Sequence, residues 1–133
     1  MLNLKVTSSD VDLAPVARQA AGLRLLVLYG SRARTDARPG SDWDFGYLAD
    51  PDFDPDALLA ALVEHLHADR VDLADLATST GQLRYQVARD ARVLFDRTGG
   101  EWSAFWMAAV GFWCDAGPVI DAAYASVLTE LGR

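Results

Sequence analysis

The chain has 133 residues, a net charge of −7 at pH 7 and 51% apolar residues, which fits one folded domain with one hydrophobic core. It is acidic, with 16 aspartates and a single lysine, so a nucleic-acid backbone is a poor expected partner. No apolar run is long enough to span a bilayer, and the first residues lack a signal-peptide pattern. These features predict a cytoplasmic protein with no membrane partner.

The first predicted elements are a short helix and a buried strand. Asp12 can cap a helix that carries Pro15 in its first turn and ends at Gly22. Leu23–Tyr29 is apolar apart from one arginine, which is typical of a strand inside a covered sheet.

A glycine–serine turn and an alternating strand come next. Gly30 and Ser31 open a polar stretch that is rich in arginine and ends in a proline–glycine turn. Over Ser41–Leu48 the residues alternate, so Asp42 and Asp44 share one face of the predicted strand and two aromatic residues share the other.

Helices and strands continue to alternate in the middle of the chain. Asp54, followed by a proline, is a predicted N-cap, and apolar residues at helical spacing follow it. A third strand is predicted over Arg70–Leu76. Ser79, with a glutamine three residues later, resembles a capping box that opens a helix to about Arg92, and Val93–Phe95 reads as a short edge strand.

The C-terminal segment is richer in aromatic residues than the rest of the chain. A double glycine separates a predicted core, residues 1–98, from a helical appendage, residues 99–133. Trp102, Trp106 and Trp113 recur at helical spacing in the appendage, and a glycine–proline pair at 117–118 should kink or break it. Aromatic residues mark cores and interfaces alike, so the appendage either packs on the sheet or presents an outer face to another chain.

Together these patterns predict a small α/β (α+β) fold. We expect a mixed sheet of three or four strands flanked by helices, with a C-terminal helical segment. Among the buried residues of the sheet we expect Leu25, Val27, Phe45 and Leu73.

The chemistry is expected where the glycine–serine turn meets the strand aspartates. Gly30 allows close backbone approach to a ligand, and Ser31 adds a hydroxyl donor to the backbone N–H groups that suit a phosphate. The carboxylates of Asp42 and Asp44 project in parallel, as Mg²⁺ requires when substrate phosphates complete its shell. Asp72 on the next strand would complete a three-carboxylate cluster. Asp75 competes for this place, but it lies on the opposite face of an ideal strand.

The segment LYGSRARTDARPGSDWDFGYL resembles the signature of the DNA polymerase β-like nucleotidyltransferase superfamily. More narrowly, it resembles the minimal nucleotidyltransferases, whose pattern is Gly-Ser, ten residues, Asp-x-Asp. The likeness runs over Leu26–Leu48 and continues more weakly through VDLADL to Arg97. Thr35 departs from the pattern, because the family often has glycine there.

The resemblance implies transfer of AMP from ATP to a hydroxyl with two Mg²⁺ ions. It assigns the metal and catalytic roles to Asp42, Asp44 and Asp72. It assigns nucleotide binding to Gly30, Ser31, Arg32 and Ser41. Asp72 would also help to deprotonate the attacking hydroxyl. Arg34 is an alternative to Arg32 for steadying phosphate oxygens, and either arginine could instead be a solvated surface residue.

The same resemblance suggests a partner. The smallest stand-alone members of the superfamily often pair with a HEPN-domain ribonuclease toxin and silence it by attaching AMP to a tyrosine. We therefore expect an antitoxin of this kind, in a homo- or hetero-oligomer. Two alternatives remain open: a transferase that acts on a small hydroxylated molecule such as an aminoglycoside, and a non-enzymatic antitoxin that acts by occlusion.

Overall fold

The computed structural model describes residues 12–34 and 40–115, with side chains described as far as Gly111. The elements in chain order are α1 (Ala14–Gln19), β1 (Leu23–Tyr29), β2 (Trp43–Ala49), α2 (Pro55–Leu66), β3 (Val71–Asp75), α3 (Gly81–Asp90), β4 (Arg92–Asp96) and α4 (Glu101–Asp115). No helix in the described part of the chain has the length and apolar character needed to cross a lipid bilayer.

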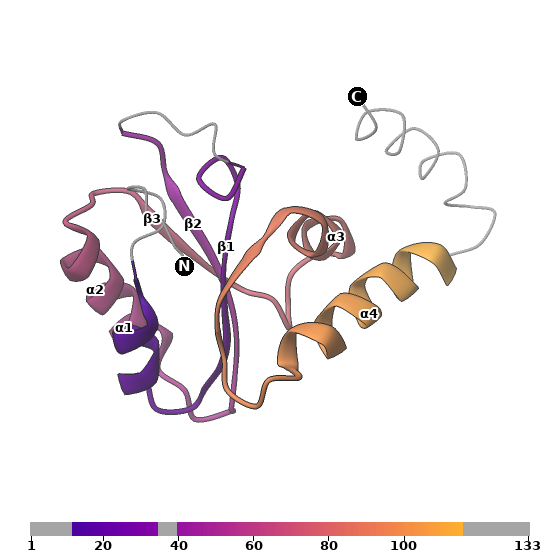
Figure 1. Ribbon diagram of the computed structural model, residues 1–133, viewed down its shortest axis with the longest axis horizontal. Helices are drawn as coiled ribbons and strands as arrows, with labels where there is room; N and C mark the ends of the chain where they lie inside the picture. Colours follow the sequence, from indigo (N-terminus) through magenta and orange to yellow (C-terminus); the bar gives the residue numbers. More distant parts are fainter. Residues whose placement is uncertain (1–11, 35–39, 116–133) are drawn as a thin grey trace, which may run out of the picture.

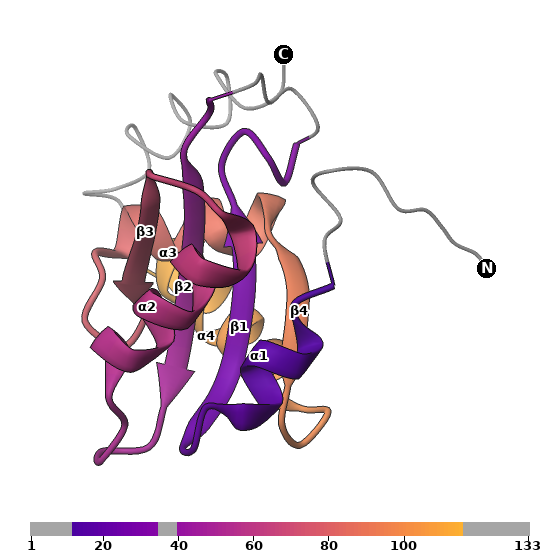
Figure 2. The ribbon, with the colours of Figure 1, turned by 90° about the vertical axis from the view of Figure 1, so that its left-hand side faces the viewer.

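One four-stranded mixed sheet, in the order β3-β2-β1-β4, forms the centre of the molecule. Strand β1 runs antiparallel to both of its neighbours, and β2 and β3 are parallel because α2 crosses over between them. Helices α1 and α2 cover one face of the sheet, and α3 and α4 cover the other (Figures 1 and 2). This three-layer arrangement confirms the predicted α/β fold, including β4 as an edge strand.

The side chains on the two faces of β1 belong to two different hydrophobic clusters. Leu26 and Leu28 pack on the α1–α2 side, and Leu25 and Val27 pack on the α3–α4 side, as alternation along a strand requires. The predicted burial of Leu25, Val27 and Phe45 is confirmed, since each has 0% exposure. Leu73 is partly buried against the α1–α2 cluster.

Helix capping follows the sequence at α2 and departs from it at α1 and α3. The helix predicted to be capped by Asp12 and to end at Gly22 spans Ala14–Gln19, and its N-cap is Leu13, which makes no side-chain cap hydrogen bond. The carboxylate of Asp54 accepts the first backbone N–H groups of α2, as predicted. The predicted cap at Ser79 is wrong by one residue, because the Thr80 hydroxyl accepts the backbone N–H of Leu83. The Ser79 hydroxyl instead donates to the carbonyl of Asp75, 2.7 Å away, and closes the turn that precedes the helix.

Helix α4 packs on the sheet and on α3 through its inner side. Phe105 and Ala109 are buried there, and Trp102 is partly buried with its ring 5.6 Å from that of Phe105. Trp106 and Met107 remain 44% and 67% exposed. The side chain of Trp113 and the break predicted at 117–118 lie outside the described residues.

Candidate active site

Three chain segments meet at one end of the sheet. The end of β1 lies beside the beginnings of β2 and β3, since β1 is antiparallel to β2 and β2 is parallel to β3 (Figure 2). Tyr29 is the register partner of Asp44, and Asp44 is the register partner of Asp72. Residues paired in this way point to the same face, so these three side chains form a row across the sheet on its α3–α4 side.

The two carboxylates of this row and the nearby carboxylate of Asp42 affect one another's charge. Asp44 is partly buried, while Asp42 and Asp72 are exposed. The pKa of Asp44 is raised, first by burial and then by the negative charges of Asp72 and Asp42. The charges of Asp42, Asp44 and Asp72 therefore interact at one end of the sheet, where the alternation of β2 and β3 predicts them.

Gly30 gives the Asp44 carboxylate the room that it occupies. A Cβ atom at Gly30 would lie 2.5 Å from Oδ2 of Asp44, and the φ of Gly30 is +77°, which disfavours any other residue. The backbone N–H groups of Ala33 and Arg34 donate to the Gly30 carbonyl and close a helical turn. Such a turn orients the preceding N–H groups in one direction, which suits phosphate oxygens.

The two arginines of the turn point to different places. The Arg32 guanidinium donates through Nε and Nη2 to the Ser41 carbonyl, at 3.3 and 3.0 Å, and lies 4.0 Å from the ring centroid of Trp43. Trp43 is on the α1–α2 face, so Arg32 fastens the turn to β2 on the side away from the carboxylates. Arg34 lies on the other side, because its Nη1 is 3.9 Å from Oδ2 of Asp90 at the end of α3, and its positive charge acts to lower the pKa of Asp44.

Asp75 lies at the other end of β3 and closes a local turn. Its carboxylate accepts the backbone N–H of Ala77 at 2.9 Å, and its register partner is Tyr47 rather than Asp44. Of the two aspartates weighed from the sequence, the structure therefore brings Asp72, and not Asp75, to the other carboxylates.

Tyr29 joins the candidate site in the structure, whereas the sequence predicted it only as part of a buried strand. Its hydroxyl lies close enough to the cluster that burial and the charges of Asp44 and Asp72 raise its pKa. The signal was present in the sequence, because Tyr29 directly precedes Gly30 at the end of the strand that leads into the turn.

The carboxylates suit a hard cation but are not drawn together around one. Within residues 12–34 and 40–115, no group of three or more aspartate, glutamate, histidine or cysteine side chains is arranged to hold a metal ion. Oδ1 of Asp42 lies 3.8 Å from Nη1 of Arg70. Mutually repelling carboxylates on one face nevertheless fit Mg²⁺ by their donor chemistry, because a bound cation would relieve that repulsion.

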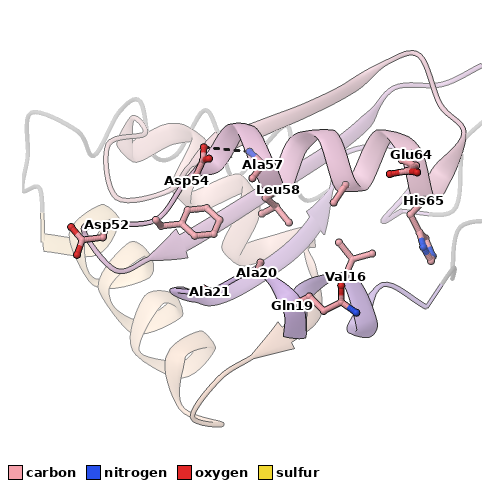
Figure 3. A pocket seen from close by; sticks show the side chains of 12 residues that line it. Val16, Gln19, Ala20, Ala21, Asp52, Asp54, Ala57, Leu58, Glu64 and His65 are labelled. Carbon is pink, nitrogen blue, oxygen red and sulfur yellow. Dashed lines mark hydrogen bonds between the residues drawn. The ribbon is translucent and has the colours of Figure 1, made fainter.

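A separate hollow lies between α1 and α2. Figure 3 shows side chains such as Gln19, Leu58 and His65 around a cavity of about 680 Å³. These helices cover the face of the sheet opposite the carboxylate row, so this cavity is not part of the candidate site.

Residues 12–99 match the family model described as "Polymerase beta, Nucleotidyltransferase". The chain belongs to this nucleotidyltransferase family. The match includes the turn at Gly30 and all three carboxylates, and it confirms the family resemblance carried by the sequence motif.

A named relative belongs to the same class of enzyme by its name. The chain is 33% identical over 95 residues to the "Protein adenylyltransferase MntA" of Aphanizomenon flos-aquae (strain 2012/KM1/D3). The aligned region is 62% of this chain and 63% of that protein, so the chain spans less than two thirds of the relative's length.

Solved structures show the same nucleotidyltransferase fold. A crystal structure of a toxin–antitoxin with AMP-PNP superposes with a TM-score of 0.69 and 24% identity, over 88% of this chain and 96% of that one. A tri-AMPylated Shewanella oneidensis HEPN toxin in complex with MNT antitoxin gives a TM-score of 0.63 and 22% identity, over 91% and 96% of the two chains. At these identities the likeness establishes the fold.

Proposed function

We propose that this nucleotidyltransferase transfers AMP from ATP, with Mg²⁺, to a tyrosine hydroxyl of a partner HEPN toxin and so acts as a cytoplasmic antitoxin. The observation that carries the proposal is the row of carboxylates beside the Gly30 turn at one end of the sheet. The name of the curated relative and the toxin–antitoxin structures of similar fold support a protein acceptor.

The residues divide the work of the reaction. The turn at Gly30 and Ser31 would hold the triphosphate, and Asp42 and Asp44 would hold two Mg²⁺ ions against it. When bound, Mg²⁺ neutralises phosphate charge and favours loss of the hydroxyl proton. Asp72 would hold one ion and accept that proton. The hydroxyl oxygen then bonds to the α-phosphorus, the bond to the β-phosphate oxygen breaks, and pyrophosphate leaves.

The remaining residues of the site have supporting parts in this proposal. Arg34 would steady phosphate oxygens, since it lies on the α3–α4 side near Asp90 and its charge acts on Asp44. Arg32 and Ser41, predicted to bind nucleotide, are joined by hydrogen bonds that hold the turn against β2. They would act on the nucleotide by positioning the turn.

Labelling of the cognate HEPN partner tests the proposal. Purified protein, ATP and Mg²⁺ should add the mass of AMP to a partner tyrosine, as read by intact-mass spectrometry and peptide mapping. Asp72→Asn should abolish the mass gain while the two proteins still co-purify. Asp75→Asn is the matched control, because it makes the same change on the same strand but away from the cluster, and it should keep labelling.

Two other results would redirect the assignment. Full neutralisation of the partner by wild-type protein with no mass gain would support occlusion, for which the exposed Trp106 and Met107 offer a contact surface. Labelling of an aminoglycoside, but not of the protein partner, would support a small-molecule acceptor.

A further inference from the structure

A second hollow opens at the same end of the sheet as the carboxylates, but on the α1–α2 face. Its volume is about 670 Å³, and it lies between the end of α2, the following loop and the beginning of β2. Its lining consists of Arg32, Gly40, Ser41, Trp43, His65, Leu66, His67, Ala68, Asp69 and Arg70. We call this hollow the basic pocket.

The basic pocket carries positive charge in an acidic chain. The chain as a whole has a charge of −7 with histidine counted as neutral, yet the two arginines that line this hollow, Arg32 and Arg70, outnumber its one aspartate, Asp69. The guanidinium of Arg32 is fixed, because it donates to the Ser41 carbonyl and stacks on Trp43. A cation that is already held in place loses little freedom when it binds an anion.

The basic pocket also borders the reacting groups. Nη1 of Arg70 lies 3.8 Å from Oδ1 of Asp42, and Arg70 precedes Asp72, the proposed proton acceptor, by two residues. The carbonyl of Arg70 accepts the backbone N–H of Trp43 at 2.9 Å, which ties this loop to β2. The acceptor hydroxyl must approach Asp72 on β3, whereas the turn that would hold the triphosphate follows β1. An acceptor that reaches Asp72 therefore comes close to Arg70, which lines this hollow.

We propose that the basic pocket binds an aspartate or glutamate side chain that lies next to the acceptor tyrosine in the partner protein. The carboxylate would receive charge-assisted hydrogen bonds from Arg32 and Arg70. It would replace Asp42 as the partner of Arg70 once Asp42 is engaged with a metal ion. The identity of the acceptor rests on the proposed function, but the binding of a carboxylate does not.

Two peptides that differ only beside the tyrosine test this pocket. Both carry a fluorescein label, one with glutamates and one with glutamines flanking the tyrosine. Fluorescence anisotropy is measured with Mg²⁺ and α,β-methylene ATP, which cannot release AMP. Wild-type protein should bind the glutamate peptide about tenfold more tightly, as expected for a charge-assisted hydrogen bond.

Variants of Arg70 decide whether the preference comes from the basic pocket. The side chain of Arg70 is 76% exposed, so Arg70→Gln should fold. This variant should bind the glutamate and glutamine peptides with about equal affinity. Arg70→Lys should keep most of the preference. Arg18→Gln makes the same charge change at an exposed position on α1 and should leave the preference unchanged. Equal binding of the two peptides, or a preference that survives Arg70→Gln, would overturn the proposal.

A transfer assay separates this proposal from the proposed function. With ATP in place of the analogue, AMP should appear on the glutamate peptide with the higher kcat/KM. A glutamate preference in binding without any AMP transfer would support the basic pocket and count against transfer to tyrosine. AMP transfer with no preference in binding would do the reverse.

Discussion

The two ends of the sheet hold aspartate in opposite ways. At the end away from the candidate site, the Asp96 carboxylate accepts backbone N–H groups from Gly99, Glu101 and Trp102, at 2.9–3.0 Å. Burial acts to raise the pKa of Asp96, but these hydrogen bonds lower it overall. At the other end the pKa of Asp44 is raised, first by burial and then by the neighbouring carboxylates of Asp72 and Asp42.

A second aspartate at the far end shows the same contrast. Asp50 accepts two hydrogen bonds from the Arg97 guanidinium, at 2.8 and 3.0 Å, and its pKa is lowered by them. The difference separates carboxylates that stabilise the fold from carboxylates that are available to a ligand. Those at the far end hold a turn and a helix in place, whereas those at the near end are crowded by like charge, which a cationic ligand would relieve.

The largest expected effect comes from removing charge at the near end. Asp42→Asn together with Asp44→Asn should abolish Mg²⁺-dependent binding of ATP, because two ligands of the metal–triphosphate complex are lost. Isothermal calorimetry with ATP and Mg²⁺ measures this. Asp50→Asn with Asp96→Asn removes the same charge at the far end and should leave the affinity unchanged. Equal affinity in wild type and the near-end variant would refute the site.

Two glycines, one at each end of the sheet, test the same comparison by the space available for a side chain rather than by charge. Gly30 and Gly99 both have a φ near +80°, at +77° and +83°, but only Gly30 has an atom close to its missing Cβ. Gly30→Ala should reduce AMP transfer about a hundredfold, since the new methyl group displaces Asp44. Gly99→Ala should cost about 1 kcal/mol of stability and leave transfer intact. Similar activity in the two variants would show that the Gly30–Asp44 contact is not needed.

The smallest expected effects are opposite changes in stability. Without metal, Asp44→Asn should stabilise the protein slightly, on the order of 0.5 kcal/mol after solvent screening, because the burial of a charge and its repulsion by like charges are both removed. Asp96→Asn should destabilise it by about 1 kcal/mol, because an acceptor for the beginning of α4 is lost. Urea denaturation at pH 7 without divalent ions measures both, and the same sign in both variants would contradict the contrast.

The pH dependence of these two effects follows from the direction of each pKa shift. The lowered pKa of Asp96 gives a stabilisation that is complete above the unfolded value, about 3.9, and is lost as pH falls through the folded pKa. The raised pKa of Asp44 gives a stabilisation that is complete below about 3.9 and is lost as pH rises through the folded pKa. Both variants should therefore approach wild type in acid and diverge in opposite directions at neutral pH.

Much of the site was predictable because it lies on strands. Strand alternation alone places Asp42 and Asp44 on one face, and it separates Asp72 from Asp75. The direction of Arg32 was not predictable, because a side chain that leaves a turn follows no period, and stacking on Trp43 decides it.

For the fold too, features set by local sequence could be predicted, and features set by distant contacts could not. Hydrophobic period and turn signals were enough for the elements, and the Asp54 cap was found from local sequence. The one-residue error at Ser79 arose because Thr80 is an equally good cap beside it. The strand order, with β1 between β2 and β4, depends on packing between residues far apart in the chain and has no local signal.

The parallel pairing of β2 with β3 limits how this chain can change in length. Because side chains alternate, sliding β3 by one residue would turn Asp72 to the face of Trp43, and sliding it by two would move the carboxylate about 7 Å along the sheet. Insertions or deletions within β3 are therefore expected to be rare among active relatives. The turn at Gly99 lies beyond the last strand and touches no carboxylate of the site, so natural length variation should accumulate there.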